Sequence, residues 1–221
     1  MNERKNIILR LLLGTCGAIG GLFGVNAFNQ YVLMGLPIGL RMVLMIITYW
    51  AIAIVPFGIM IYAKDKLSEY GFVKDKIVNQ VIVGIIIGVC MSFVLTLIPI
   101  FVGIGDWVDN GQHYQYPWQF IYEFTYCIAA IGLVEEYVFR GFIYSKVKKL
   151  CDSVAVSTVV SSILFGLFHF LSGNIIQMIM TGIIGVFLCI CKEKIRNCTL
   201  LSLIIAHGIY DALITVWNSV L

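Results

Sequence analysis

The sequence predicts an all-α membrane protein: a bundle of about seven transmembrane helices forming one integral-membrane domain, residues 1–221. First, 60% of the 221 residues are hydrophobic and only 12% are charged. A soluble domain has about 25% charged residues, so much of the solvent of this chain must be lipid. Second, the apolar runs are long and lack the alternation of strands. Third, Lys and Arg follow alternate runs.

Each apolar run is long enough to cross a bilayer, which takes about 20 residues in a helix. Lipid offers the backbone no hydrogen-bond partners, so these runs must be helical. The predicted spans are residues 7–28, 42–63, 77–104, 118–143, 154–172, 174–191 and 199–218. Residues 29–41 leave room for an eighth.

The positive charges give an orientation. Of the 15 Lys and Arg residues, 13 fall on one side of the predicted bundle, and that side should be cytoplasmic. The thirteen are Arg4, Lys5, Arg10, Lys64, Lys66, Lys74, Lys76, Lys146, Lys148, Lys149, Lys192, Lys194 and Arg196. We therefore expect a multi-pass protein of the cell membrane, with the N-terminus in the cytoplasm and the C-terminus outside.

A few ionisable side chains lie inside the predicted spans. They are Glu123, Glu135, Glu136, Arg140, His169, His207 and Asp211. Charges at bilayer depth cost about 2.5–3.5 kcal/mol each on insertion scales, and they usually mark function. Glu123 is close to the outer end of its span, so we expect it at the membrane interface.

Spacing assigns partners to these groups. Glu136 and Arg140 are four residues apart on one helix face, in the favoured order for an ion pair. This pairing leaves Glu135 without a partner on its own helix. His207 and Asp211 are also four apart. Counted at 1.5 Å per residue, Glu135, His207 and Asp211 lie at similar depths, whereas His169 is deeper by about 8 Å unless its helix starts in the cytosolic headgroups or tilts.

A carboxylate beside an imidazole can hold a water molecule and take its proton. Glu135 and His169 would form this pair, while His207 and Asp211 would orient groups or stabilise an oxyanion. A divalent metal such as zinc, bound by Glu135, His169, His207 and Asp211, is the alternative source of the nucleophile. No H-E-x-x-H motif is present, so no standard zincin helix is expected, and the only cofactor that a hydrolytic site suggests here is this divalent metal.

Three segments, "EEYVFR" at 135–140, "FGLFH" at 165–169 and "HGIYD" at 207–211, occur in this order. Together they resemble the CAAX protease and bacteriocin-processing family (CPBP or ABI family) of intramembrane proteases, over about residues 118–215. The resemblance implies helices around a polar, water-accessible cavity. It implies Glu135 as general base, His169 as the residue that holds the water, and His207 with position 211 as the oxyanion site. Glu136 and Arg140 would support them.

The resemblance also implies a substrate class. Family members cleave the C-terminal tripeptide from prenylated proteins, or act in peptide maturation and bacteriocin self-immunity. We expect a peptide or protein substrate at the membrane, which a lipid modification would suit, with membrane lipids around it and no nucleic acid. The prenyl-protein branch carries Asn where this chain has Asp211, and an ionised Asp cannot donate to an oxyanion.

Three other functions fit the same residues. A proton-coupled transporter would use Glu135, Glu136 and Asp211 as a relay, although no repeat or pair of broken helices supports one. A haem protein would use His169 and His207 as axial ligands. A non-proteolytic immunity scaffold would need no chemistry from them.

Overall fold

A computed structural model describes residues 2–109, 111–172 and 175–221, and within these residues every regular element is a helix. The N-terminal half contains α1 (Asn2–Tyr31), α2 (Ile38–Tyr49), α3 (Ile54–Ala63), α4 (Ile77–Ser92) and α5 (Ile98–Phe101). The C-terminal half contains α6 (Pro117–Tyr126), α7 (Leu133–Glu136), α8 (Tyr144–Cys151), α9 (Val154–Phe168), α10 (Ile175–Lys194) and α11 (Leu200–Val220). The predicted all-α class is confirmed.

Short tighter or wider helical turns connect these helices. The 3₁₀ turns are η1 (Leu33–Gly35), η2 (Trp50–Ala53), η3 (Leu67–Tyr70), η5 (Gly105–Trp107) and η8 (His169–Ser172). The π-helical turns are η4 (Phe93–Leu97), η6 (Cys127–Gly132) and η7 (Tyr137–Ile143). Because η6 and η7 flank α7, one continuous helical run extends from Pro117 to Cys151. We call it the motif helix.

In the described part of the chain, six helices are long and apolar enough to cross a membrane. They cover Glu3–Gly35, Ile38–Ala63, Ile77–Phe101, Val154–Leu171, Ile175–Lys194 and Leu200–Val220. The expected span 118–143 is helical throughout but is not among the six, because the motif helix collects the ionisable residues. Residues 29–41 form no separate span: α1 ends at Tyr31, and α2 begins at Ile38 after η1.

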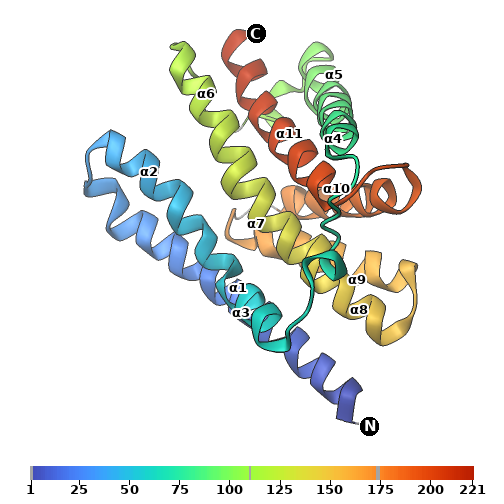
Figure 1. The fold of residues 1–221 in the computed structure, drawn as a ribbon. Coiled ribbons are helices and arrows are strands. Elements are labelled where there is room, and N and C mark those ends of the chain that lie inside the picture. Colours follow the sequence, from blue (N-terminus) through green and yellow to red (C-terminus); the bar gives the residue numbers. More distant parts are fainter. Residues whose placement is uncertain (1, 110, 173–174) are drawn as a thin grey trace.

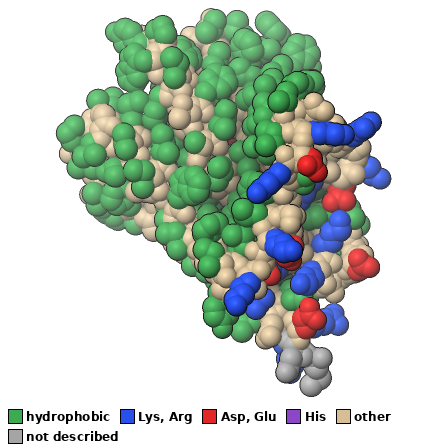
Figure 2. All heavy atoms as spheres, in the orientation of Figure 1, with side chains coloured by type: hydrophobic (Ala, Val, Ile, Leu, Met, Phe, Trp, Pro, Cys, Tyr) green, Lys and Arg blue, Asp and Glu red, His purple; other side chains and the backbone are tan. Residues whose placement is uncertain are grey.

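Figure 1 shows the arrangement of the helices. The N-terminus lies at one end, and α5, the start of α6 and the C-terminus lie at the other. The α9–α10 pair crosses the long helices at a steep angle. Figure 2 shows that Lys, Arg, Asp and Glu gather toward the end that holds the N-terminus, whereas the rest of the visible face is hydrophobic. This is the surface expected of a multi-pass membrane protein.

Glycines bring the helices close together. A Cβ atom at Gly21 in α1 would lie 2.7 Å from the Cα of Ile52, and one at Gly14 would lie 2.3 Å from the ring of Phe142. On α4, Cβ atoms at Gly84 and Gly88 would lie 2.6 Å from backbone oxygens of α11. Contacts this close require residues without side chains, so glycine fixes how α1 and α11 seat in the bundle.

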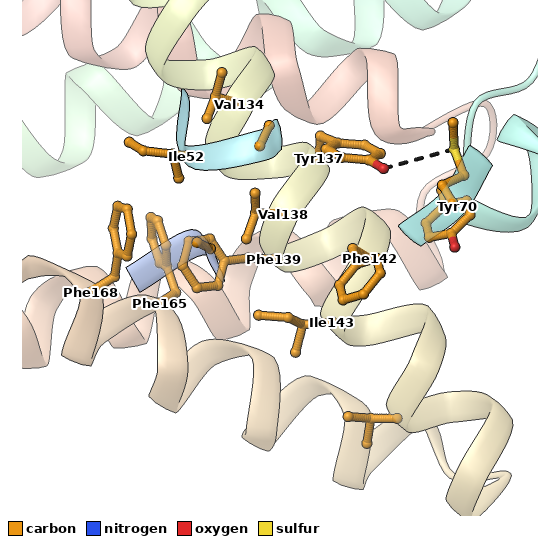
Figure 3. Close-up of a cluster of buried hydrophobic side chains, with 14 of the residues drawn as sticks. Ile52, Tyr70, Val134, Tyr137, Val138, Phe139, Phe142, Ile143, Phe165 and Phe168 are labelled. Carbon is orange, nitrogen blue, oxygen red and sulfur yellow. Dashed lines mark hydrogen bonds between the residues drawn. The ribbon is translucent and has the colours of Figure 1, made fainter. Parts of the chain in front are cut away.

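A hydrophobic core surrounds the motif helix. Figure 3 shows Val134, Val138 and Phe139 of this helix beside Ile52 of η2 and the rings of Phe165 and Phe168 from α9. These side chains are almost fully buried. The core therefore holds the motif helix between the N-terminal helices and α9, and Glu135, Glu136 and Arg140 of this helix are buried.

Candidate functional site

The site is built around the imidazole of His207, which lies between carboxylates from two helices. Its Nδ1 is 2.8 Å from Oε1 of Glu136, and its Nε2 is 3.3 Å from Oδ2 of Asp211. Oε2 of Glu135 lies 3.8 Å from the same Nε2. Ionised carboxylates only accept hydrogen bonds, so this geometry suits an imidazolium that donates from both nitrogens.

Glu136 and Arg140 form the ion pair that their spacing predicts. Nη1 of Arg140 donates to Oε1 of Glu136 over 2.8 Å, and neither side chain has any exposed surface. The same oxygen faces His207. Glu136 therefore contacts two cationic side chains: Arg140 on its own helix and the imidazole of His207 on α11.

Glu135 also faces His207, although it precedes Glu136 directly in the chain. Its Oε1 accepts a hydrogen bond from the hydroxyl of Tyr49 at the end of α2. Its Oε2 is buried and has no hydrogen-bond partner among the described residues. One oxygen of this carboxylate is thus held by the protein, and the other is left to accept a proton.

His169 reaches the cluster through the ring of Phe165. Its Nδ1 lies 2.9 Å from the carbonyl oxygen of Phe165, which can only accept, so Nδ1 carries the hydrogen of this bond. The Phe165 ring contacts the ring of His169 at 5.0 Å, that of His207 at 5.8 Å and the Arg140 guanidinium at 4.0 Å. The steep crossing of α9 in Figure 1 agrees with the tilt that the depth count requires for this helix.

The π-helical turn η7 accepts hydrogen bonds from side chains of other helices. In η7 the backbone departs from the α-helical pattern, and two of its carbonyls accept hydrogen bonds from side chains. Ser161 Oγ donates to the Phe139 carbonyl over 2.8 Å, and Lys192 Nζ donates to the Arg140 carbonyl over 2.8 Å. π-Helical turns recur at functional sites. Here α9 and α10 hold the turn that carries Arg140.

Glycines set the close approach of α11 to the motif helix. A Cβ at Gly208 would lie 2.6 Å from the Cα of Ile128, and one at Gly132 would lie 2.6 Å from the carbonyl oxygen of Ile204. Gly208 directly follows His207. Gly208, the residue next to His207, therefore allows the backbone contact that places the imidazole against Glu136.

Two residues differ from the sequence-based picture. Glu123, expected at the interface, is only 5% exposed, and it accepts hydrogen bonds from Thr215 over 2.9 Å and Tyr114 over 3.0 Å. Sequence reasoning missed Tyr49. The sequence feature that could have pointed to Tyr49 is its polar hydroxyl group in the middle of the apolar span 42–63.

A metal centre was the alternative for this site. Among the described residues, no group of three or more His, Cys, Asp or Glu side chains is arranged to hold a metal ion. Both nitrogens of His207 are directed at carboxylate oxygens. A shared ion bound by Glu135, His169, His207 and Asp211 stays a prediction.

A cluster of carboxylates around an imidazole, inside a helical bundle, is an arrangement that can activate a water molecule and stabilise a developing charge. Residues 117–213 match the family model described as "Type II CAAX prenyl endopeptidase Rce1-like". The motif-bearing part of the chain is thus similar to the CAAX-type endopeptidases that this model describes, in agreement with the resemblance that the three motifs carry. No curated protein and no solved structure matches the chain.

Proposed function

We propose that this protein is an intramembrane endopeptidase that hydrolyses peptide bonds with a water molecule activated by Glu135. The observation that carries the proposal is the pairing of Oε2 of Glu135, buried and without a hydrogen-bond partner in the described chain, with the His207 ring 3.8 Å away. The family match over residues 117–213 supports a protease of the CAAX type.

In the proposed reaction, Glu135 takes a proton from water as the water oxygen attacks the scissile carbonyl. His169 holds the water with its Nε2 lone pair. The imidazolium of His207 stabilises the oxyanion, and Asp211 and Glu136 keep that ring oriented. The proton on Glu135 then passes to the leaving nitrogen as the carbon–nitrogen bond breaks.

The substrate of the proposed reaction is a peptide or protein at the membrane. A prenylated C-terminus is favoured by the name of the matched family, and the bundle is open to lipid on its apolar faces. The distribution of Lys and Arg favours an N-terminus in the cytoplasm and a C-terminus outside. Peptide maturation and bacteriocin self-immunity are the roles that such a reaction would serve.

The test uses purified protein in detergent and two internally quenched peptides. One ends in a farnesylated CAAX sequence, and the other is the same peptide without the farnesyl group. We expect cleavage by the wild type and a loss of about 10²–10⁴-fold in Glu135→Ala, His169→Ala and His207→Ala. His113→Ala is the matched control, because this histidine lies in the exposed loop before α6 with 56% of its side chain exposed.

Two results would contradict the proposal. Cleavage retained by Glu135→Ala would rule out its role as the base. Activity lost on chelation and restored by zinc would replace the water mechanism with a metal-dependent one. With the water mechanism, chelator leaves the rate unchanged.

A further inference from the structure

Tyr49 lies at a break in an N-terminal membrane span. It is the last residue of α2, and the chain then passes through the 3₁₀ turn η2 before α3 begins. Its hydroxyl donates a hydrogen bond to Oε1 of Glu135, which is 86 residues away in the sequence. Tyr49 lies outside residues 117–213, so the family match assigns it no role.

The backbone that carries Tyr49 is fixed against the motif helix. η2 packs on α7, and Figure 3 shows Ile52 of η2 beside Val134 of α7. Both side chains are fully buried. Behind η2, a Cβ at Gly21 would lie 2.8 Å from the carbonyl oxygen of Ala51, so α1 presses directly on this turn. The turn cannot move without disturbing either α1 or α7.

The ring of Tyr49 is fixed as well. It meets the ring of Tyr126 edge-on, with centroids 6.2 Å apart, and Tyr126 stacks on Tyr122 at 6.0 Å. The hydroxyl of Tyr122 in turn donates to the carbonyl of Met42 in α2 over 3.2 Å. Aromatic pairs of this geometry add to the energy of burial and restrict ring rotation. Three tyrosines thus connect α2 to the motif helix and aim one phenol at Glu135.

We propose that Tyr49 is a positioning residue for the general base, an inference that rests on the proposed function. By occupying Oε1, the phenol fixes the rotation of the Glu135 carboxylate, so that Oε2 is the oxygen directed toward His207 and the water. In the reaction Oε2 takes the proton of water and later gives it to the leaving nitrogen. Tyr49 keeps its own proton throughout, so no further donor or acceptor is required.

The experiment compares Tyr49→Phe with Tyr62→Phe in the cleavage assay. Tyr49→Phe removes one hydroxyl and keeps the ring packed on Tyr126, whereas Tyr62 is 84% exposed and serves as the matched control. A hydrogen bond to a charged group accounts for about a 10- to 100-fold effect. We expect kcat of Tyr49→Phe to fall by about that factor with KM unchanged, because the phenol contacts the base and not the substrate. Tyr62→Phe should match the wild type.

A stability measurement tests the contact without activity. Thermal unfolding of the wild type, Tyr49→Phe, Glu135→Gln and the double variant forms a double-mutant cycle. Coupling between the two changes supports the contact, and additive changes overturn it. This cycle remains informative when Tyr49→Phe lowers the yield of folded protein.

The outcomes separate the two proposals. Activity retained by Glu135→Ala overturns the proposed function. When Glu135→Ala is inactive, wild-type kcat in Tyr49→Phe overturns only the inference about Tyr49. A rise in KM with unchanged kcat also overturns it, because the phenol would then bind the substrate.

Discussion

His207 and Glu136 meet across two helices, 71 residues apart in the chain, with Nδ1 of the imidazole 2.8 Å from Oε1 of the carboxylate. The same oxygen receives the Arg140 guanidinium at 2.8 Å. A single buried oxygen atom therefore joins the motif helix to α11, and the stability of the fold and the geometry of the site depend on the same contact.

Replacing Arg140 with Met should destabilise the protein by about 3–5 kcal/mol, because a buried carboxylate then loses its guanidinium partner. Unfolding in detergent, followed by intrinsic fluorescence, measures this loss. Lys148→Met is the control, since its 3.4 Å contact with Glu193 is partly exposed and is worth at most about 1 kcal/mol. Equal stability of the two variants would show that Glu136 does not need Arg140.

Gly208→Ala should abolish cleavage, because the new Cβ would lie 2.6 Å from the Cα of Ile128 and push α11 away from the motif helix. Gly24→Ala is the control, since nothing lies within 4 Å of a Cβ at that position. Activity and melting temperature are measured for both variants. Full activity of Gly208→Ala would mean that α11 can shift without separating His207 from Glu136.

Asp211→Asn should keep measurable activity, whereas Asp211→Leu should lose it. The Asn side-chain oxygen can still accept from His207 Nε2, which lies 3.3 Å from Oδ2 of Asp211, and its amide can also donate to an oxyanion. Leu removes both capabilities. Initial rates at one saturating peptide concentration distinguish the two variants. Equal rates for Asp211→Asn and Asp211→Leu would show that position 211 does not act through hydrogen bonding.

Asp65 should make the free energy of unfolding depend on pH. Burial favours its neutral form, but hydrogen bonds from Lys146 at 2.6 Å and Tyr70 at 2.7 Å outweigh burial and lower the pKa of Asp65 below its ordinary value of 3.8. A carboxyl group with a lowered folded-state pKa stabilises the fold above its unfolded-state pKa. This contribution is complete above about pH 4 and is lost as the pH falls through the folded-state value.

The melting temperature of the wild type should therefore exceed that of Asp65→Asn at pH 7, and the two should converge toward pH 3. Asp75→Asn, at an exposed position in the same loop, should differ little from the wild type at either pH. A constant gap between the wild type and Asp65→Asn at both pH values would exclude the ion pair with Lys146 as its cause.

Orientation can be tested with a native cysteine. Cys151 is exposed at the end of α8, next to Lys148 and Lys149, so we expect it on the cytoplasmic side. A membrane-impermeant maleimide should label Cys151 in inside-out vesicles and not in intact cells. Asp106→Cys in a Cys151→Ser background should show the reverse pattern, and labelling of Cys151 in intact cells would invert the proposed topology.

The helices and the pairs within one helix could be predicted from the sequence, because they depend on local spacing. Glu136 with Arg140 and His207 with Asp211 are four residues apart, and both pairs are in contact. The charged loops were equally readable, since Lys and Arg mark the ends of the apolar runs.

Contacts between helices could not be predicted from spacing, because they depend on rotation and crossing. Tyr49 meets Glu135 across 86 residues, and Lys146, one of the thirteen charges assigned to the cytoplasmic side, is buried against Asp65 across 81 residues. A 3.6-residue period also placed Glu135 about 100° from the Glu136–Arg140 pair. Both glutamates nevertheless face the same imidazole, one at each nitrogen.

The seating of α11 has a consequence for biosynthesis. This helix lies against glycines on both sides, from Gly84 and Gly88 of α4 and Gly132 of the motif helix, and it carries His207 and Asp211. Among the described helices, α11 comes last in the order of translation. A nascent chain that has inserted the rest of the bundle therefore already holds Glu135, Glu136 and Arg140, but it has neither the imidazole nor Asp211. Under the proposed mechanism, the growing chain stays inert toward neighbouring membrane proteins until α11 docks.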